Sequence, residues 1–149
     1  MCGPAGPPPA GVGRAVAQIR LLIIEGHEAV RRALAARLAS PEVEIVGSTG
    51  DHEDGLRQAL SLHPDVILLE LKGPNSRWLE LIRRLAEAGL MQRVIVLTSY
   101  LDDEERRLVL EAGARAYLLK DLHSKHLIEA IRQISRGASA AYSAPGDWA

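Results

Sequence analysis

The chain of 149 residues has one cysteine and no phenylalanine, and only 3% of its residues are aromatic. One cysteine cannot form an internal disulfide, so we expect a protein of a reducing compartment, the cytoplasm. No apolar run reaches the 18 residues that suggest a membrane span, and no secretory signal is evident. With so few aromatic side chains, the core must consist of Leu, Ile, Val and Ala.

An excess of one charge is also missing, since 18 Lys and Arg residues stand against 19 Asp and Glu residues. This balance argues against broad electrostatic binding to nucleic acid. Hydrophobic residues make up 47% of the chain and charged residues 25%, which excludes a disordered, collagen-like or disulfide-rich protein. We expect a flexible Pro/Gly-rich arm over residues 1–17, one domain over 18–137 and a short tail over 138–149.

Within that domain, short apolar runs alternate with helical periodicity. The runs predict strands at residues 19–24, 43–46, 65–69, 93–97 and 116–119. Apolar residues three and four apart predict a helix after each strand, and these helices end near residues 39, 63, 89, 112 and 137. Continuous apolar strands alternating with helices imply a parallel sheet covered on both faces. The predicted fold class is therefore α/β, a doubly wound five-stranded (βα)₅ domain.

Polar side chains follow four of these apolar runs, at Glu25, Glu70, Thr98–Ser99 and Lys120. In a doubly wound sheet, ligands bind outside the carboxyl ends of the strands. We therefore expect two carboxylates, a hydroxyl and an ammonium to converge on one crevice. The alternative is that strand ends meet water in any case, so that polar residues there carry no function.

Four segments, at residues 22–31, 64–74, 94–99 and 111–121, resemble the receiver domain of bacterial two-component response regulators. The resemblance covers about residues 19–137 and is strongest to the NarL/LuxR-type subclass. It implies a CheY-like (flavodoxin-like) sheet with strand order 2-1-3-4-5. In that family, two acids after the first strand hold Mg²⁺, and an Asp ending the third strand accepts a phosphoryl group from a histidine kinase.

The resemblance also assigns roles at the ends of the last two strands. Thr98 and Lys120 match the residues that bind the phosphoryl oxygens, and Ser99 has the small side chain that the site requires. Tyr117 matches the aromatic residue that reports the phosphorylation state.

Three positions depart from the family pattern. The acidic pair is reduced to Glu25 followed by Gly26, the phosphoacceptor position holds Glu70 instead of Asp, and Trp78 replaces a turn glycine. We expect only weak Mg²⁺ binding, through Glu25 with Glu70 and the backbone of Lys72, because one carboxylate is missing.

Glu70 is one methylene longer than Asp, which moves its carboxylate by roughly 1.5 Å. A misplacement of about 1 Å can cost a positioned reaction about 100-fold, so efficient phosphoryl acceptance is not expected, and neither is enzymatic activity. The longer arm brings negative charge to the place of the phosphoryl oxygens, where Lys120 and Thr98 could hold it.

These observations predict a stand-alone, atypical receiver that acts by protein–protein contact, with a partner or a second copy, in a phosphorylation-independent state. The expected contact face is the fourth helix, fifth strand and fifth helix, or the first and fifth helices. Only residues 138–149 follow the domain, so direct DNA binding is not expected.

Three other interpretations stay open. The domain could be a decayed scaffold, in which Lys120 forms only a structural ion pair with Glu25 or Glu70. It could be a conventional receiver that a histidine kinase phosphorylates on Glu70. A flavodoxin-like nucleotide- or flavin-binding protein is the third, although the acids at Glu25 and Glu28 would repel phosphate.

Overall fold

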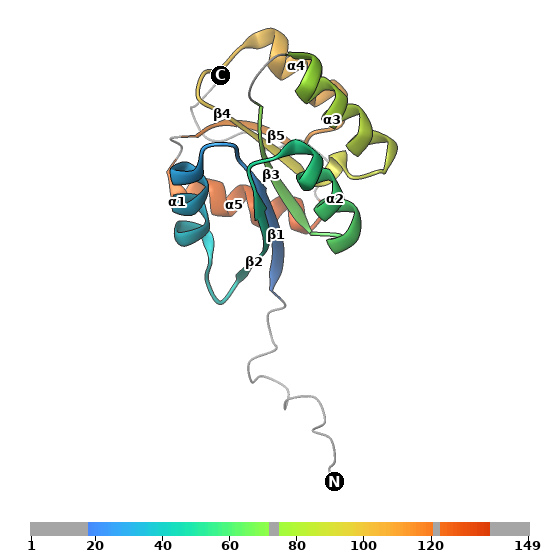
Figure 1. Ribbon diagram of the computed structural model, residues 1–149. Coiled ribbons are helices and arrows are strands. Elements are labelled where there is room, and N and C mark those ends of the chain that lie inside the picture. The colour runs from blue at the N-terminus through green and yellow to red at the C-terminus, as the bar shows by residue number, and fades with distance from the viewer. Residues whose placement is uncertain (1–17, 72–74, 121–122, 138–149) are drawn as a thin grey trace.

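The computed structural model describes residues 18–71, 75–120 and 123–137, and within them the chain forms one parallel sheet. The sheet has the order β2-β1-β3-β4-β5, as Figure 1 shows. Its strands are β1 (Ile19–Ile24), β2 (Val43–Thr49), β3 (Val66–Glu70), β4 (Val94–Thr98) and β5 (Ala116–Leu119). The predicted fold class and strand order are confirmed.

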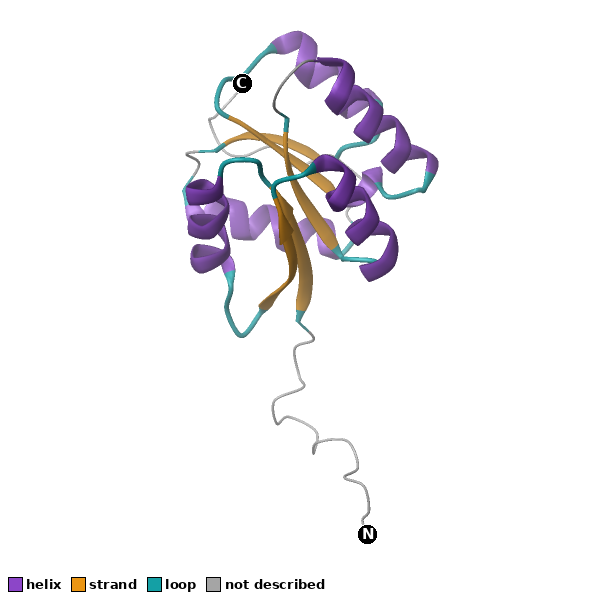
Figure 2. Ribbon diagram, in the orientation of Figure 1, coloured by secondary structure: helices purple, strands orange, loops and turns teal. Residues whose placement is uncertain are grey.

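One helix follows each strand, and the helices cover both faces of the sheet (Figure 2). They are α1 (Glu28–Leu38), α2 (His52–Leu62), α3 (Asn75–Glu87), α4 (Asp103–Glu111) and α5 (Ser124–Ser135), and a short 3₁₀ turn (Met91–Arg93) precedes β4. None of the helices in the described part of the chain has the length and apolar character needed to cross a bilayer.

Side chains that alternate along the strands divide the core into two layers. On one face of β1, Leu22 and Ile24 pack with residues of α2, α3 and α4. On the other face, Leu21 and Ile23 pack with residues of α1 and α5. Trp78, which the sequence marks as unusual, lies in the first turns of α3 and is buried in the first layer. Because helices cover both faces of the sheet, polar groups can gather only at the ends of its strands.

The predicted boundaries differ from the observed ones mainly at β2, which continues to Thr49 instead of ending at residue 46. The parallel ladder with β1 shifts register between Leu21 and Leu22, so one residue of β2 bulges and pairing then resumes at Gly47. Backbone hydrogen bonds extend the strand where no apolar pattern marks it. The predicted arm (1–17) and tail (138–149), together with Lys72, lie outside the described residues.

Candidate functional site

Four strands deliver the predicted site residues to the same edge of the sheet. β3 ends at Glu70 and β4 at Thr98, while β1 and β5 end one residue before Glu25 and Lys120. Because all four strands are parallel, their carboxyl ends lie side by side.

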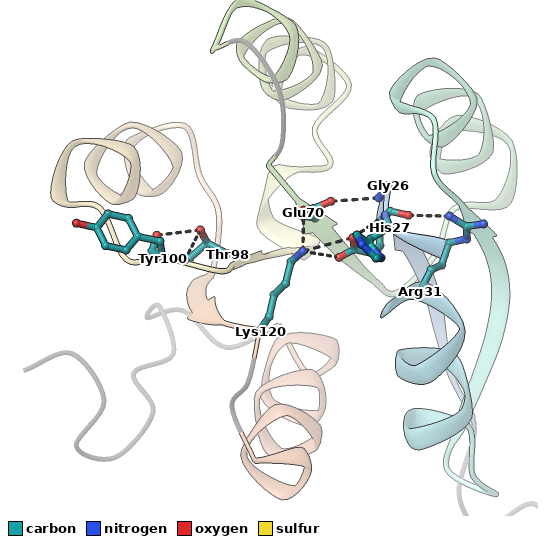
Figure 3. Close-up of polar contacts among 8 residues, drawn as sticks. Gly26, His27, Arg31, Glu70, Thr98, Tyr100 and Lys120 are labelled. Atoms are coloured by element: carbon teal, nitrogen blue, oxygen red, sulfur yellow. Dashed lines mark hydrogen bonds and ion pairs between the residues drawn. The ribbon is translucent and has the colours of Figure 1, made fainter. Parts of the chain in front are cut away.

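Three of these side chains meet in a charged contact, which we call the carboxylate–lysine cluster (Figure 3). The Nζ atom of Lys120 lies 2.6 Å from Oε2 of Glu70 and 3.1 Å from Oε1 of Glu25. The side chain of Glu25 is 1% exposed, that of Glu70 8% and that of Lys120 17%. Oε1 of Glu25 accepts no hydrogen bond from the described residues, so its ion pair with Lys120 is what compensates for its burial.

Backbone amides at the start of α1 bind the other oxygen of each carboxylate, and Oε2 of Glu25 also lies 3.4 Å from Nζ of Lys120. The N–H of Gly26 donates to Oε1 of Glu70 at 3.1 Å, and the N–H of His27 donates to Oε2 of Glu25 at 2.9 Å. These amides precede the first turn of α1, where N–H groups point out of the helix and favour negative charge. This role of Gly26 and His27 was not predicted from the sequence, although an acid just before a predicted helix start is a signal for it.

The proximity of three charges shifts their proton affinities in different directions. Burial, with help from the neighbouring Glu70, raises the pKa of Glu25. Burial alone would also raise the pKa of Glu70, but the hydrogen bonds that it accepts from Lys120 and from the N–H of Gly26 lower it. Burial opposes the charge of Lys120, yet its bonds to both carboxylates raise its pKa. At neutral pH, Lys120 is therefore an ammonium and Glu70 a carboxylate, and Glu25 takes up a proton first as the pH falls.

The side chains at this edge do not fit a Mg²⁺ centre. Magnesium needs near-octahedral oxygen ligands, and protein sites provide them through carboxylates and water. Gly26 offers no carboxylate, and the ammonium of Lys120 already pairs with the carboxylates of both Glu25 and Glu70. In the described ranges, no three His, Cys, Asp or Glu side chains gather in a way that could hold a metal ion.

Thr98 belongs to the same edge, but its hydroxyl points elsewhere. Its Oγ1 donates to the carbonyl oxygen of Tyr100 at 2.9 Å and accepts from the N–H of Tyr100 at 3.3 Å (Figure 3). From the sequence, Thr98 could hold the carboxylate of Glu70; in the structure, a local bond within the β4–α4 loop satisfies its hydroxyl instead. The adjacent Ser99 is exposed.

Tyr117 connects β5 to the beginning of α4. The ring is buried, and its hydroxyl donates to Oε1 of Glu105 at 2.6 Å and accepts from the N–H of Asp102 at 3.1 Å. Asp102 is also the N-cap of α4, since its side chain accepts from the N–H of Glu105. Burial, reinforced by Glu105, raises the pKa of Tyr117, so the phenol stays protonated.

Comparison with known proteins gives a consistent result. Residues 21–132 match the model of the response regulator receiver domain. The transcriptional regulatory protein LiaR of Bacillus subtilis is 41% identical over 120 residues, which cover 80% of this chain and 57% of LiaR. The nitrate/nitrite response regulator NarL of Escherichia coli is 33% identical over 118 residues, covering 78% of this chain and 55% of NarL.

The chain thus spans about half the length of these curated relatives. Among solved structures, a two-component response regulator of the LuxR family from Aurantimonas sp. SI85-9A1 has a TM-score of 0.76 at 22% identity. The match covers 87% of this chain and 91% of that one, and it shows the shared fold.

Proposed function

The chain belongs to the response regulator receiver family, and from this premise we propose that it is an atypical receiver that works without phosphorylation. The carboxylate–lysine cluster carries the proposal. In it, Lys120 is already bound to two carboxylates of its own chain, at 2.6 and 3.1 Å. The carboxylate of Glu70 thereby makes the contact with lysine that a phosphoryl group makes in the family pattern.

Glu70 is poorly placed to act as a phosphoryl acceptor. One of its oxygens is bound by Lys120 and the other by the N–H of Gly26. An attack on phosphorus would use an oxygen that already accepts one of these hydrogen bonds, which lowers its nucleophilicity, at an edge whose side chains do not fit a metal ion. The lowered pKa of Glu70 fits a carboxylate that is stabilised by its partners and is correspondingly less reactive.

A receiver held in one state would act through its surface. Tyr117 ties β5 to the first turn of α4, so the position of α4 is fixed from the interior of the domain. We propose that the face formed by α4, β5 and α5 binds a protein partner or a second copy, with the face of α1 and α5 as the alternative. The cytoplasmic location stays a prediction, and no enzymatic activity is expected.

A conventional receiver that a histidine kinase phosphorylates on Glu70 is the competing function. The flavin- or nucleotide-binding interpretation rested on the fold alone, and membership of the receiver family already explains that fold. The two receiver functions differ in a single observable, which is the transfer of a phosphoryl group to Glu70.

The test is incubation of the full chain with Mg²⁺ and acetyl phosphate, followed by intact mass measurement after an acid quench. We expect no phosphoryl adduct on the wild type. The matched control is the double variant Gly26→Asp/Glu70→Asp, which restores the second acid of the pair and the aspartate acceptor. It should gain an adduct under the same conditions. An adduct on the wild type that disappears in Glu70→Gln would refute the proposal.

A further inference from the structure

The turn between β1 and α1 decides where the carboxylate of Glu25 points, and its backbone is held from two sides. The N–H of Glu25 donates to the carbonyl oxygen of Thr49 at 2.9 Å, which continues the pairing with β2. The carbonyl oxygen of Glu25 accepts from Nη1 of Arg31, also at 2.9 Å (Figure 3). Oε2 of Glu25 accepts from the N–H of His27 at 2.9 Å, and both carboxylate oxygens face Nζ of Lys120, Oε1 at 3.1 Å and Oε2 at 3.4 Å.

Arg31 lies near the N-terminus of α1, a position that does not favour a cation. The positive end of the helix dipole is there, in the first turns of the helix. The charge-assisted bond to the carbonyl of Glu25 supplies the acceptor that offsets this penalty. The neighbouring Arg32 behaves differently, since it pairs with Glu28 on the surface, with both side chains more than half exposed.

Gly50, which directly follows β2, leaves room for this contact. A Cβ atom on Gly50 would lie 2.7 Å from Nη1 of Arg31, 3.3 Å from the carbonyl oxygen of Glu25 and 3.4 Å from Cα of Gly26. The φ angle of Gly50 lies outside the left-handed region, so glycine is required here for space and not for conformation. A larger residue would push the guanidinium off the carbonyl.

We propose that Arg31, seated over Gly50, is a positioning residue that fixes the β1–α1 turn and aims Glu25 at Lys120. The inference rests on the proposed function, because it names what holds the carboxylate–lysine cluster in its single arrangement. It also explains how the turn keeps its shape at a site that does not fit a metal ion. The turn is fixed by a guanidinium and by backbone amides of the same chain.

The experiment follows the ionisation of the cluster by NMR in the full chain, through the carboxyl carbon of Glu25 and the side-chain carbon next to Nζ of Lys120. In Arg31→Met and Gly50→Ala, the loosened ion pair should let the pKa of Lys120 fall towards its ordinary value. The amide signals of Gly26 and His27 should shift as well.

Two further variants separate positioning from general destabilisation. Arg32→Met removes a neighbouring arginine that does not touch the turn, and it should leave both titrations unchanged. Arg31→Lys keeps a donor within reach of the carbonyl and should restore part of the wild-type titration. Because Arg31→Met and Gly50→Ala break the same contact, the double variant should shift the pKa no further than the larger single shift.

A folded Arg31→Met protein with the wild-type titration of Glu25 and Lys120 would overturn the inference. So would a Gly50→Ala protein with unchanged titrations, and this variant keeps the test decisive if Arg31→Met does not fold. A wild type that accepts a phosphoryl group would refute the proposed function alone, since the titrations report the position of Glu25 and not its role.

Discussion

Replacing Lys120 by methionine tests whether the carboxylate–lysine cluster stabilises the fold. The substitution keeps a side chain of similar length and removes the ammonium that pairs with the buried carboxylates of Glu25 and Glu70. Removing one partner of a buried ion pair costs about 3–5 kcal/mol, because it leaves the other charge uncompensated. Lys120 keeps 17% of its side chain exposed, and a carboxylate can take up a proton. We therefore expect the free energy of unfolding to fall by about 3 kcal/mol at neutral pH.

The pH dependence identifies the origin of this loss. The raised pKa of Lys120 means that its ion pairs stabilise the fold below the ordinary lysine pKa and are lost as the pH rises through the raised value. The lowered pKa of Glu70 means that its contribution is present above its ordinary value of 4.5 and is lost as the pH falls through the lowered one. Ionisation of Glu25 has the opposite effect on stability to that of Glu70, because a raised pKa means that the charged form of Glu25 opposes folding. Without Lys120, both carboxyl groups protonate more readily, so the variant should approach the wild type in acid.

The assay is urea denaturation of the wild type and Lys120→Met at about pH 7.5 and about pH 4.5, with Lys125→Met as the control for an exposed lysine of α5. A loss of about 3 kcal/mol corresponds to a fall in melting temperature of roughly 10 °C for a domain of this size. The difference should be clearly smaller at the lower pH. Equal stability at pH 7.5, or the same loss at both pH values, would refute the electrostatic reasoning.

Three other predictions follow from the same structure. Tyr117→Phe removes the hydroxyl that binds the N–H of Asp102, so stability should fall by about 1–2 kcal/mol and that amide should exchange faster with solvent; unchanged exchange would contradict the link. Gly47→Ala would bring a Cβ within 2.9 Å of Cδ1 of the buried Leu22 and should cost about 1–3 kcal/mol in urea denaturation, whereas the exposed Ser48→Ala should change stability by less than about 0.5 kcal/mol. Replacing EDTA by about 10 mM Mg²⁺ should move the melting temperature by less than about 2 °C, and a larger rise would reveal a metal site.

The fold could be predicted from the sequence because each strand contains a short apolar run. The apolar runs of β1 and β5 match the observed bounds, since both strands are buried by helices on two faces. At β2 the signal fails after residue 46, because Gly47 and Ser48 extend the strand by backbone pairing at the sheet edge. β2 is less covered than β5, the strand at the opposite edge, since only its first and last residues are buried, and its other side chains need not be apolar.

For the site, the sequence predicted which residues reach one edge but not which of them bind one another. The meeting of Glu25, Glu70 and Lys120 follows from strand order, and the structure shows it. The bond between Thr98 and Tyr100 depends on a rotamer and a loop conformation that no residue pattern encodes. The contact of Arg31 depends on the space over Gly50, which follows β2, and this proximity becomes visible only once β1 and β2 are paired.

The most direct test of the central claim is a titration of the full chain with beryllofluoride, a phosphoryl mimic, in the presence of Mg²⁺. The amide signals of Gly26, Glu70, Thr98 and Tyr117 are followed by NMR, with Gly26→Asp/Glu70→Asp as the responsive control. If the ammonium of Lys120 is held by its own carboxylates, these signals stay in place in the wild type and move only in the control. A saturable shift of the same signals in the wild type would show an ordinary receiver pocket and would contradict the account.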